Sequence, residues 1–323
     1  TDQSQQSPCL GEINSTMSIF VPDNCIDLTS VDERKRLLDL FAQEEYGVRP
    51  RACAKKLAYR VCETKRFDTF CGQHTQMLYG EFAMDFYVWT PADFDKPLRT
   101  FVCPLHPAAY RNKDFWHDPQ AIVDYVPIKQ ITDSGVAVVM LLSGSVADDA
   151  PGGETSGIFA AMGCRRTLRS WGVISAWAWA ASKVADYLVS DKRFDRKHIA
   201  VAGHSRSGKT ALWAAATDER FCMAVSNCSG NSGAALSRGN TGETIADVTG
   251  RFPHWFCKKY AKYAYKEDKL PFDQHQLLGL IAPRYLYVAS ATQDAWADPD
   301  GELLSARMAS AYYEAHGLTG VVA

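Results

Sequence analysis

With 323 residues, 46% of them hydrophobic and 22% charged, the chain is long enough to bury a large core in one or two domains. A formal net charge of −2, with both signs interspersed, excludes the basic footprint of a nucleic-acid-binding protein. The apolar run nearest to transmembrane length, residues 171–188, is broken by Ser175, Ser182, Lys183 and Asp186. We therefore expect a globular protein with no nucleic-acid or membrane partner.

The ten cysteines do not define a disulfide scaffold in a chain of this length. Those in strand-like runs are expected to behave as small apolar residues: Cys103, Cys222 and Cys228. Those in the polar N-terminal region are candidates for disulfides: Cys9, Cys25, Cys53, Cys62 and Cys71. No Cys-x-x-Cys or His-x-x-x-His spacing indicates a metal site, so we expect none.

The first 50 residues are predicted to form a surface segment followed by one helix. Residues 1–29 are polar and interrupted by prolines. Ser30 and Glu33 then form a capping box that opens an amphipathic helix, and Gly47 and Pro50 close it.

Further along the chain, strand patterns alternate with helix patterns. Residues 79–90 alternate in hydrophobicity and predict a half-buried antiparallel strand. Apolar runs predict further strands at residues 99–105, 135–142, 199–202, 221–227 and 284–290. Helices are predicted at residues 173–188, 209–217, 255–265 and 302–316. This order predicts one domain over residues 1–323: the three-layer αβα sandwich of the α/β-hydrolases, with a mostly parallel central sheet.

One turn has the pattern of a nucleophile elbow. Residues 203–208 (Gly-His-Ser-Arg-Ser-Gly) connect a buried strand to a helix, which would expose the Ser205 hydroxyl above the sheet edge, beside the helix N-terminus. Gly203 supplies the small residue that the close approach of strand and helix requires, whereas Ser207 followed by Gly208 meets the Gly-x-Ser-x-Gly pattern only loosely. The alternative interpretation is a serine in an ordinary strand-to-helix turn.

Two cations follow this serine. If the elbow forms, Arg206 and Lys209 are expected to face the mouth of the pocket, where they suit an anionic or uronic substrate, and Arg206 can donate to an oxyanion. The alternative is that both are solvated residues at a helix end.

The acid partner is expected in the loop after the strand at residues 284–290, because triads of this fold follow the order Ser, acid, His. Asp294 lies where this loop would deliver a carboxylate to the sheet edge, next to Trp296, and Asp298 is the second candidate. A solvated turn residue is the alternative for either aspartate.

The segment from Gly203 to Trp213 resembles the elbow of bacterial glucuronoyl esterases, carbohydrate esterase family 15. The resemblance extends from about residue 171 to residue 304 through further blocks in order, at residues 226–230, 233–238, 242–244, 252–256, 273–275 and 294–299. It implies Ser205 as nucleophile, Arg206 as oxyanion support, and contacts of Lys209, Glu243 and Trp296 with a glucuronate ring. Cys228 stands where many members carry a catalytic Glu, which favours Asp294 as the acid.

The base is the missing partner. The family's histidine follows the last strand, and none of the eight histidines of this chain has that position, so we expect it beyond Ala323. His106 follows a predicted strand where hydrolases place an oxyanion loop, but it lacks the glycine run of such loops, and Pro107 has no N–H to donate.

The predicted activity is ester hydrolysis through an acyl-enzyme. The resemblance implies an ester between 4-O-methyl-D-glucuronic acid of xylan and lignin alcohols, no cofactor, a role in plant biomass degradation, and a monomer secreted or in the periplasm, where such a substrate is found. Two alternatives remain open. One is an acetyl xylan esterase or another carbohydrate esterase on the same fold, and the other is a catalytically silent hydrolase fold that binds glucuronoxylan.

Overall fold

The computed structural model describes residues 26–50, 57–163 and 165–318. The predictions for residues 1–25, and for disulfides of Cys9, Cys25 and Cys53, therefore lie outside the described residues. Within the described part of the chain, six cysteines are free thiols: Cys62, Cys71, Cys103, Cys222, Cys228 and Cys257.

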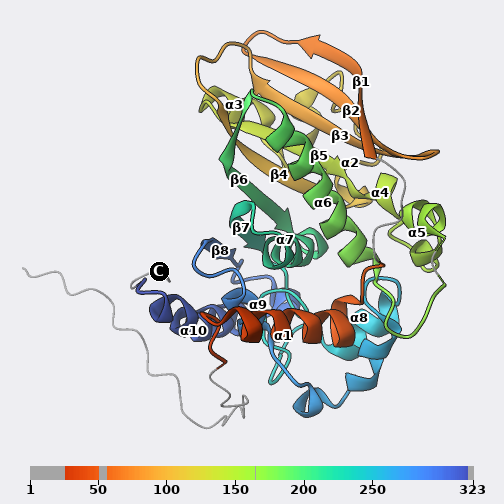
Figure 1. The fold of residues 1–323 in the computed structure, drawn as a ribbon, viewed down its shortest axis with the longest axis vertical. Helices are drawn as coiled ribbons and strands as arrows, with labels where there is room; N and C mark the ends of the chain where they lie inside the picture. The colour runs from red at the N-terminus through yellow and green to blue at the C-terminus, as the bar shows by residue number, and fades with distance from the viewer. Residues whose placement is uncertain (1–25, 51–56, 164, 319–323) are drawn as a thin grey trace, which may run out of the picture.

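One eight-stranded sheet runs through the described chain (Figure 1). Its strands are β1 (Leu57–Arg66), β2 (Phe70–Tyr79), β3 (Phe82–Pro91), β4 (Leu98–Leu105), β5 (Ala137–Leu142), β6 (Phe194–His204), β7 (Phe221–Asn227) and β8 (Tyr285–Ala289). The spatial order is β1-β2-β3-β5-β4-β6-β7-β8. The pairs from β1 to β5 are antiparallel, and those from β5 through β4, β6 and β7 to β8 are parallel.

Strands β1 to β4 follow one another without a helix in residues 57–105, all of which the structure describes, and most of the helices lie in the connections after β4. The α-helices are α1 (Val31–Phe41), α2 (Pro107–Tyr110), α3 (Ile128–Asp133), α4 (Ser143–Val146), α5 (Gly157–Met162), α6 (Val173–Ser190), α7 (Arg206–Thr217), α8 (Ile245–Arg251), α9 (Gln274–Gly279) and α10 (Pro299–Ala315). A π-helical turn, η1 (Ala42–Tyr46), extends α1, and 3-10 helices occur at η2 (Pro119–Ile122), η3 (Gly153–Thr155), η4 (Lys258–Tyr263), η5 (Glu267–Lys269) and η6 (Ala295–Ala297). None of the helices in these ranges is long and apolar enough to cross a bilayer.

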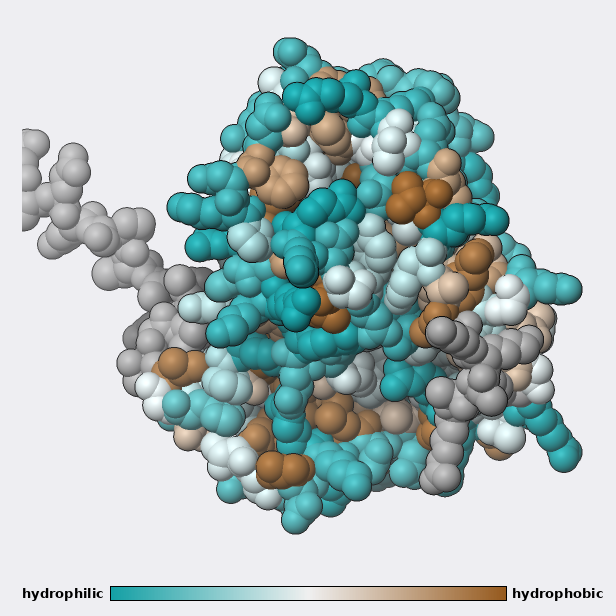
Figure 2. All heavy atoms as spheres, turned by 45° about the horizontal axis from the view of Figure 1, so that its top comes forward, coloured by the Kyte–Doolittle hydropathy of each residue, from teal (hydrophilic) through white to brown (hydrophobic). Residues whose placement is uncertain are grey.

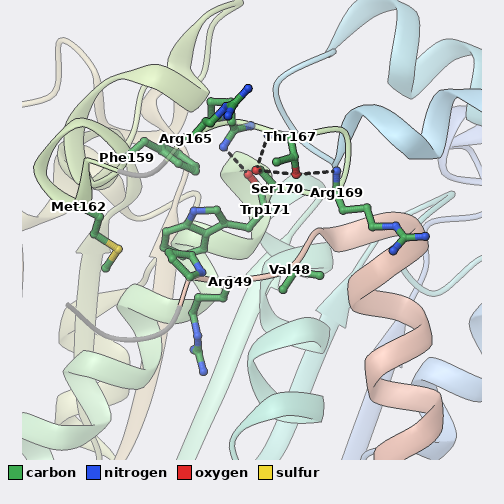
Figure 3. A pocket seen from close by; sticks show the side chains of 11 residues that line it. Val48, Arg49, Phe159, Met162, Arg165, Thr167, Arg169, Ser170 and Trp171 are labelled. Atoms are coloured by element: carbon green, nitrogen blue, oxygen red, sulfur yellow. Dashed lines mark hydrogen bonds between the residues drawn. The ribbon is translucent and has the colours of Figure 1, made fainter.

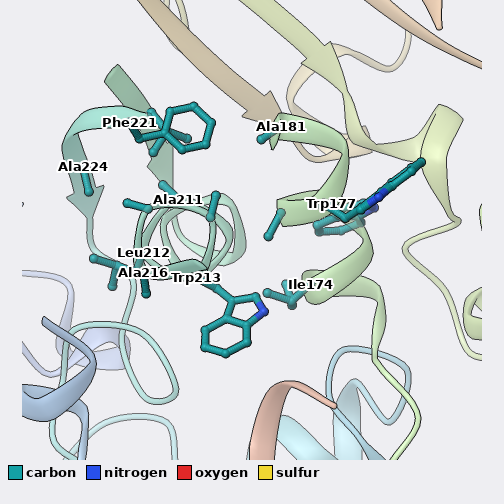
Figure 4. Close-up of a cluster of buried hydrophobic side chains, with 14 of the residues drawn as sticks. Ile174, Trp177, Ala181, Ala211, Leu212, Trp213, Ala216, Phe221 and Ala224 are labelled. Atoms are coloured by element: carbon teal, nitrogen blue, oxygen red, sulfur yellow. The ribbon is translucent and has the colours of Figure 1, made fainter. Parts of the chain in front are cut away.

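The sheet separates two hydrophobic cores, as the predicted three-layer sandwich requires. Successive residues of β5 alternate between them: Val139 and Leu141 belong to the larger core, and Val138 and Met140 to the smaller. The larger core lies under α6 and α7, where Trp177, Trp213 and Phe221 pack among alanines (Figure 4). The smaller core lies under α2, η2 and α3. On the face seen in Figure 2, hydrophobic residues form only separate patches between hydrophilic ones.

Most predicted elements are confirmed, including the capped helix at Ser30, the strands β4 to β8 and the helices α6, α7 and α10. Two predictions differ from the structure. The antiparallel strand predicted at residues 79–90 is β3, which begins at Phe82, because Tyr79 ends β2 and Gly80, at φ 64°, turns the chain between the two strands. Residues 255–265 are not an α-helix, because Trp255 accepts from Ile174 and Cys257 donates to Glu45, which leaves only the 3-10 helix η4.

Candidate active site

Ser205 lies in a strained turn between β6 and α7. Its φ of 56° and ψ of −127° belong to a region that L-residues rarely adopt, as expected for the predicted elbow. A Cβ on Gly203 would lie 2.1 Å from the Ser207 carbonyl oxygen, so only glycine fits there. The Ser205 side chain makes no capping bond to α7 and is therefore available for chemistry.

The ends of three parallel strands are tied together around this serine. The Ser205 N–H donates to the Asn227 carbonyl at 2.9 Å, and the Cys228 N–H donates to the Ala289 carbonyl at 2.8 Å. Adjacent strands lie about 4.8 Å apart, so the end of β8 lies roughly 10 Å from Ser205. This places the loop that carries Asp294 on the same sheet edge as Ser205.

Arg206 is held by a buried carboxylate that the sequence analysis missed. Its guanidinium is ion-paired with Asp149, which also accepts from His254 Nε2 at 3.1 Å and from Trp255 Nε1 at 2.8 Å. Burial opposes ionisation of Asp149, but these three donors and the charge of Arg206 hold its pKa well below the ordinary value. Arg206 is therefore fixed in position beside Ser205 by a permanent anion.

Two aromatic rings complete the setting of Arg206. Its guanidinium carbon lies 4.9 Å from the Trp255 ring centre and 5.5 Å from that of Phe252, and the two rings stack at 3.8 Å. The Arg206 Nε has no hydrogen-bond partner in the described structure, so one donor of the guanidinium remains unused. A developing oxyanion at Ser205 would need a cation held in this way.

The position of Lys209 differs from the prediction. Its side chain is 1% exposed and does not face an open pocket mouth. The ammonium donates to the carbonyls of Ser229 (2.7 Å) and Asn231 and forms an ion pair with Glu243, which is 5% exposed. The physical reason is the turn after β7, which folds over the first turns of α7 and encloses the cation.

Trp296 lies beside this pair without touching it through its side chain. The Glu243 N–H donates to the Trp296 carbonyl at 2.9 Å. The indole itself is 43% exposed and lies 4.6 Å beneath the guanidinium of Arg251. Of the residues expected to contact a glucuronate ring, Trp296 is thus the one that is open to a ligand.

The two candidate acids have different surroundings. Asp294 is half-buried and accepts from the Ala297 N–H at 3.3 Å. Burial raises the pKa of the nearby Cys228 thiol, and Asp294 adds to this effect. Asp298 is buried, and it accepts from Thr241 and from Gly301 at the start of α10. Asp298 is therefore committed to a structural role, which leaves Asp294 as the candidate acid.

Among the described histidines, none hydrogen-bonds the Ser205 hydroxyl or Asp294. His254 is bound to Asp149. His106 is buried near Arg206 and His204, and this burial lowers its pKa to about 4, with both neighbours adding to the effect. In the described residues, no group of three or more His, Cys, Asp or Glu side chains is placed to hold a metal ion.

Of the residues around Ser205, Asp149 is the one that sequence reasoning overlooked. It lies in the loop after α4, in the connection that leaves the carboxyl end of β5, and a carboxylate at that edge of the sheet was the available signal. Trp255 and Phe252 belong to the block at residues 252–256, to which the sequence assigns no role.

Comparison with known proteins identifies relatives for most of the chain. A family model for glucuronyl esterases of fungi matches residues 113–317. The chain is 53% identical over 151 residues to a carbohydrate esterase from an unknown prokaryotic organism, an alignment that covers 47% of this chain and 35% of that protein. It is 37% identical over 153 residues to a 4-O-methyl-glucuronoyl methylesterase of Hypocrea jecorina, covering 43% of this chain and 33% of that one.

The fold is also found among solved structures. A glucuronoyl esterase from Solibacter usitatus superposes with a TM-score of 0.80 at 31% identity, covering 89% of this chain and 81% of that one. The alignments with the curated relatives span about a third of their length.

Proposed function

This chain belongs to the glucuronyl esterase family, and from that membership we propose that it is a serine esterase that cleaves the ester between 4-O-methyl-D-glucuronic acid of xylan and lignin alcohols. The observation that carries the proposal is the strained Ser205 turn beside an arginine fixed by Asp149.

In the proposed reaction the Ser205 oxygen attacks the ester carbonyl carbon. The carbonyl oxygen becomes an oxyanion that the N–H groups at the start of α7 and the Arg206 guanidinium stabilise. Collapse of this intermediate releases the alcohol and leaves a glucuronoyl ester on Ser205, which water then hydrolyses.

The Ser205 hydroxyl needs a base that takes its proton and returns it to the alcohol. We propose that this base is a histidine whose ring lies in space between the Ser205 hydroxyl and the Asp294 carboxylate, with the carboxylate orienting the ring. The ends of β6 and β8 lie roughly 10 Å apart on either side of β7, a separation that an imidazole ring above the sheet edge can bridge. The described histidines do not fill this role, so the acid role of Asp294 rests on its place on the sheet edge.

The proposed substrate agrees with the surroundings of Ser205. Trp296 is an exposed aromatic surface on which a sugar ring can stack, and Arg206, beside Ser205, can donate to the carbonyl oxygen of the glucuronoyl ester. A polymer of this kind is outside cells, so we also propose that the protein acts as a monomer after secretion or in the periplasm.

The test compares hydrolysis of benzyl glucuronate with that of an aryl acetate. The proposal predicts a preference for the glucuronate ester and a loss of roughly a thousandfold or more in kcat for Ser205→Ala. A preference for the acetate would indicate a different carbohydrate esterase. Turnover that survives Ser205→Ala would refute the nucleophile, and binding of glucuronoxylan without turnover by the wild-type chain would identify a silent fold.

A further inference from the structure

A cavity of about 430 Å³ lies away from Ser205, between α5 and the segment that follows α1 (Figure 3). Four of the eleven residues that line it are arginines and none is acidic: Arg49, Arg165, Arg166 and Arg169. Its volume falls within the range of small-ligand sites. The chain as a whole carries a net charge of −2, so this concentration of positive charge is a local feature.

The interior of the cavity is apolar while its rim is cationic. Phe159, Met162 and Trp171 contribute the apolar surface, and Arg166 lies 5.0 Å over the Phe159 ring. Arg166 is also held by a 2.8 Å hydrogen bond to the Trp171 carbonyl. This arginine is therefore part of the wall, and its removal would disturb the cavity itself.

The other three arginines are exposed and form no ion pair with the residues that the structure describes, although Arg49 interacts with the charge of Asp218 at longer range. In the described ranges, no carboxylate lies within 4.0 Å of Arg49, Arg165 or Arg169. Figure 3 shows them distributed around Trp171, with Arg165 above, Arg169 beside α1 and Arg49 below. Because they are spread out, they cannot converge on one compact ion, and they suit a ligand whose negative charges are spaced along its length.

We propose that this cavity binds a segment of an acidic polysaccharide through its uronate carboxylates. Guanidinium groups pair with carboxylates in a planar, two-bond geometry, and the apolar interior suits the apolar face of a sugar ring. The choice of a glycan over other polyanions rests on the proposed function. The site would hold the polymer at a distance from the ester that Ser205 attacks.

The floor of this cavity is joined to the wall of the catalytic site. Val173 and Ile174, just after Trp171, donate to the carbonyls of His254 and Trp255 at 2.9 and 3.2 Å. Substitutions for the test should spare these contacts, and Arg165 and Arg169 qualify because they are exposed.

The test measures binding of a xylan oligosaccharide bearing at least two unesterified 4-O-methylglucuronates spaced along its chain, by isothermal calorimetry at low salt. The variant is Arg165→Gln/Arg169→Gln. The control is Arg196→Gln/Lys197→Gln, which removes the same charge from exposed positions on β6. We expect the cavity variant to bind about tenfold more weakly than the wild type, because two charge pairs are lost. The control variant should bind as tightly as the wild type.

Three further measurements decide the interpretation. Neutral xylo-oligosaccharide should bind equally weakly to all three proteins, and the cavity variant should hydrolyse benzyl glucuronate as the wild type does. Equal affinity of the cavity variant and the wild type for the acidic oligosaccharide would overturn the proposal, as would inorganic sulfate or phosphate binding as tightly as the oligosaccharide. Because the probe carries no ester and the cavity variant leaves Ser205, Arg206 and Trp296 unchanged, a difference in affinity between this variant and the wild type reports on the cavity, whether or not the chain is an esterase.

Discussion

The buried pair of Lys209 and Glu243 provides a quantitative test of how the site is built. Lys209→Met keeps the aliphatic stem and removes the ammonium, which leaves the Glu243 carboxylate and the carbonyls of Ser229 and Asn231 without their donor. Removing one partner of a buried ion pair costs about 3–5 kcal/mol, so we expect the free energy of unfolding to fall by about 4 kcal/mol. For a chain of 323 residues that corresponds to a decrease of roughly 6 °C in Tm.

Glu243→Gln should cost less, about 2 kcal/mol, because the ammonium keeps its two carbonyl acceptors. The double variant should cost less than the sum of the single changes, since it leaves no uncompensated charge. Urea unfolding followed by tryptophan fluorescence measures all three values. Single variants that lose less than 1 kcal/mol would show that the pair is solvated, as in an open substrate pocket, and would refute the enclosed geometry.

Three other changes test separate features. Ser205→Gly should be more stable than Ser205→Ala by about 1–2 kcal/mol in urea unfolding, because only glycine relieves the positive φ, and equal stabilities would argue against strain at the elbow. Asp149→Asn should lower kcat for benzyl glucuronate about tenfold or more with little change in KM, because Arg206 loses the anion that holds it in position. An unchanged kcat would show that Arg206 does not stabilise the oxyanion. Burial raises the pKa of Glu45 from 4.5 to about 8, so the folded chain keeps a proton that the unfolded chain releases, and stability should fall by about 4 kcal/mol as pH rises from 5 to 8. Glu45→Gln should remove this pH dependence of the free energy of unfolding. If the wild type and the variant lost the same stability between pH 5 and pH 8, the raised pKa of Glu45 would be contradicted.

The elbow could be predicted from sequence because it depends on neighbours in the chain. A strand, a turn with glycine at 203 and a helix are all encoded between residues 199 and 217, and the structure confirms each of them. The parallel strands were predictable for the same reason, since each is a short apolar run.

Features that depend on distant contacts were not predictable. Asp149 pairs with Arg206 although 57 positions separate them in the sequence, and no local pattern predicts that pairing. The burial of Lys209 results from the turn at residues 229–231, which a helix pattern cannot reveal. Strand β1 was missed because its residues are mostly exposed and carry little periodicity, and it forms only by pairing with β2.

The roles assigned to Ser205, Arg206 and Asp294 in catalysis, and to Lys209, Glu243 and Trp296 in binding, stay predictions. The structure supports them unequally. Ser205 and Arg206 are in a geometry suited to acyl transfer, whereas Lys209 and Glu243 can contact a ligand only if the turn after β7 moves.

The central claim is that the hydroxyl of Ser205 forms a covalent ester with the acyl part of the substrate. Acid quenching during turnover of benzyl glucuronate, followed by peptide mass mapping, measures this directly. The account predicts a glucuronoyl adduct on the peptide that contains Ser205 and none in Ser205→Ala. Turnover without an adduct on that peptide, or an adduct on another residue, would contradict it.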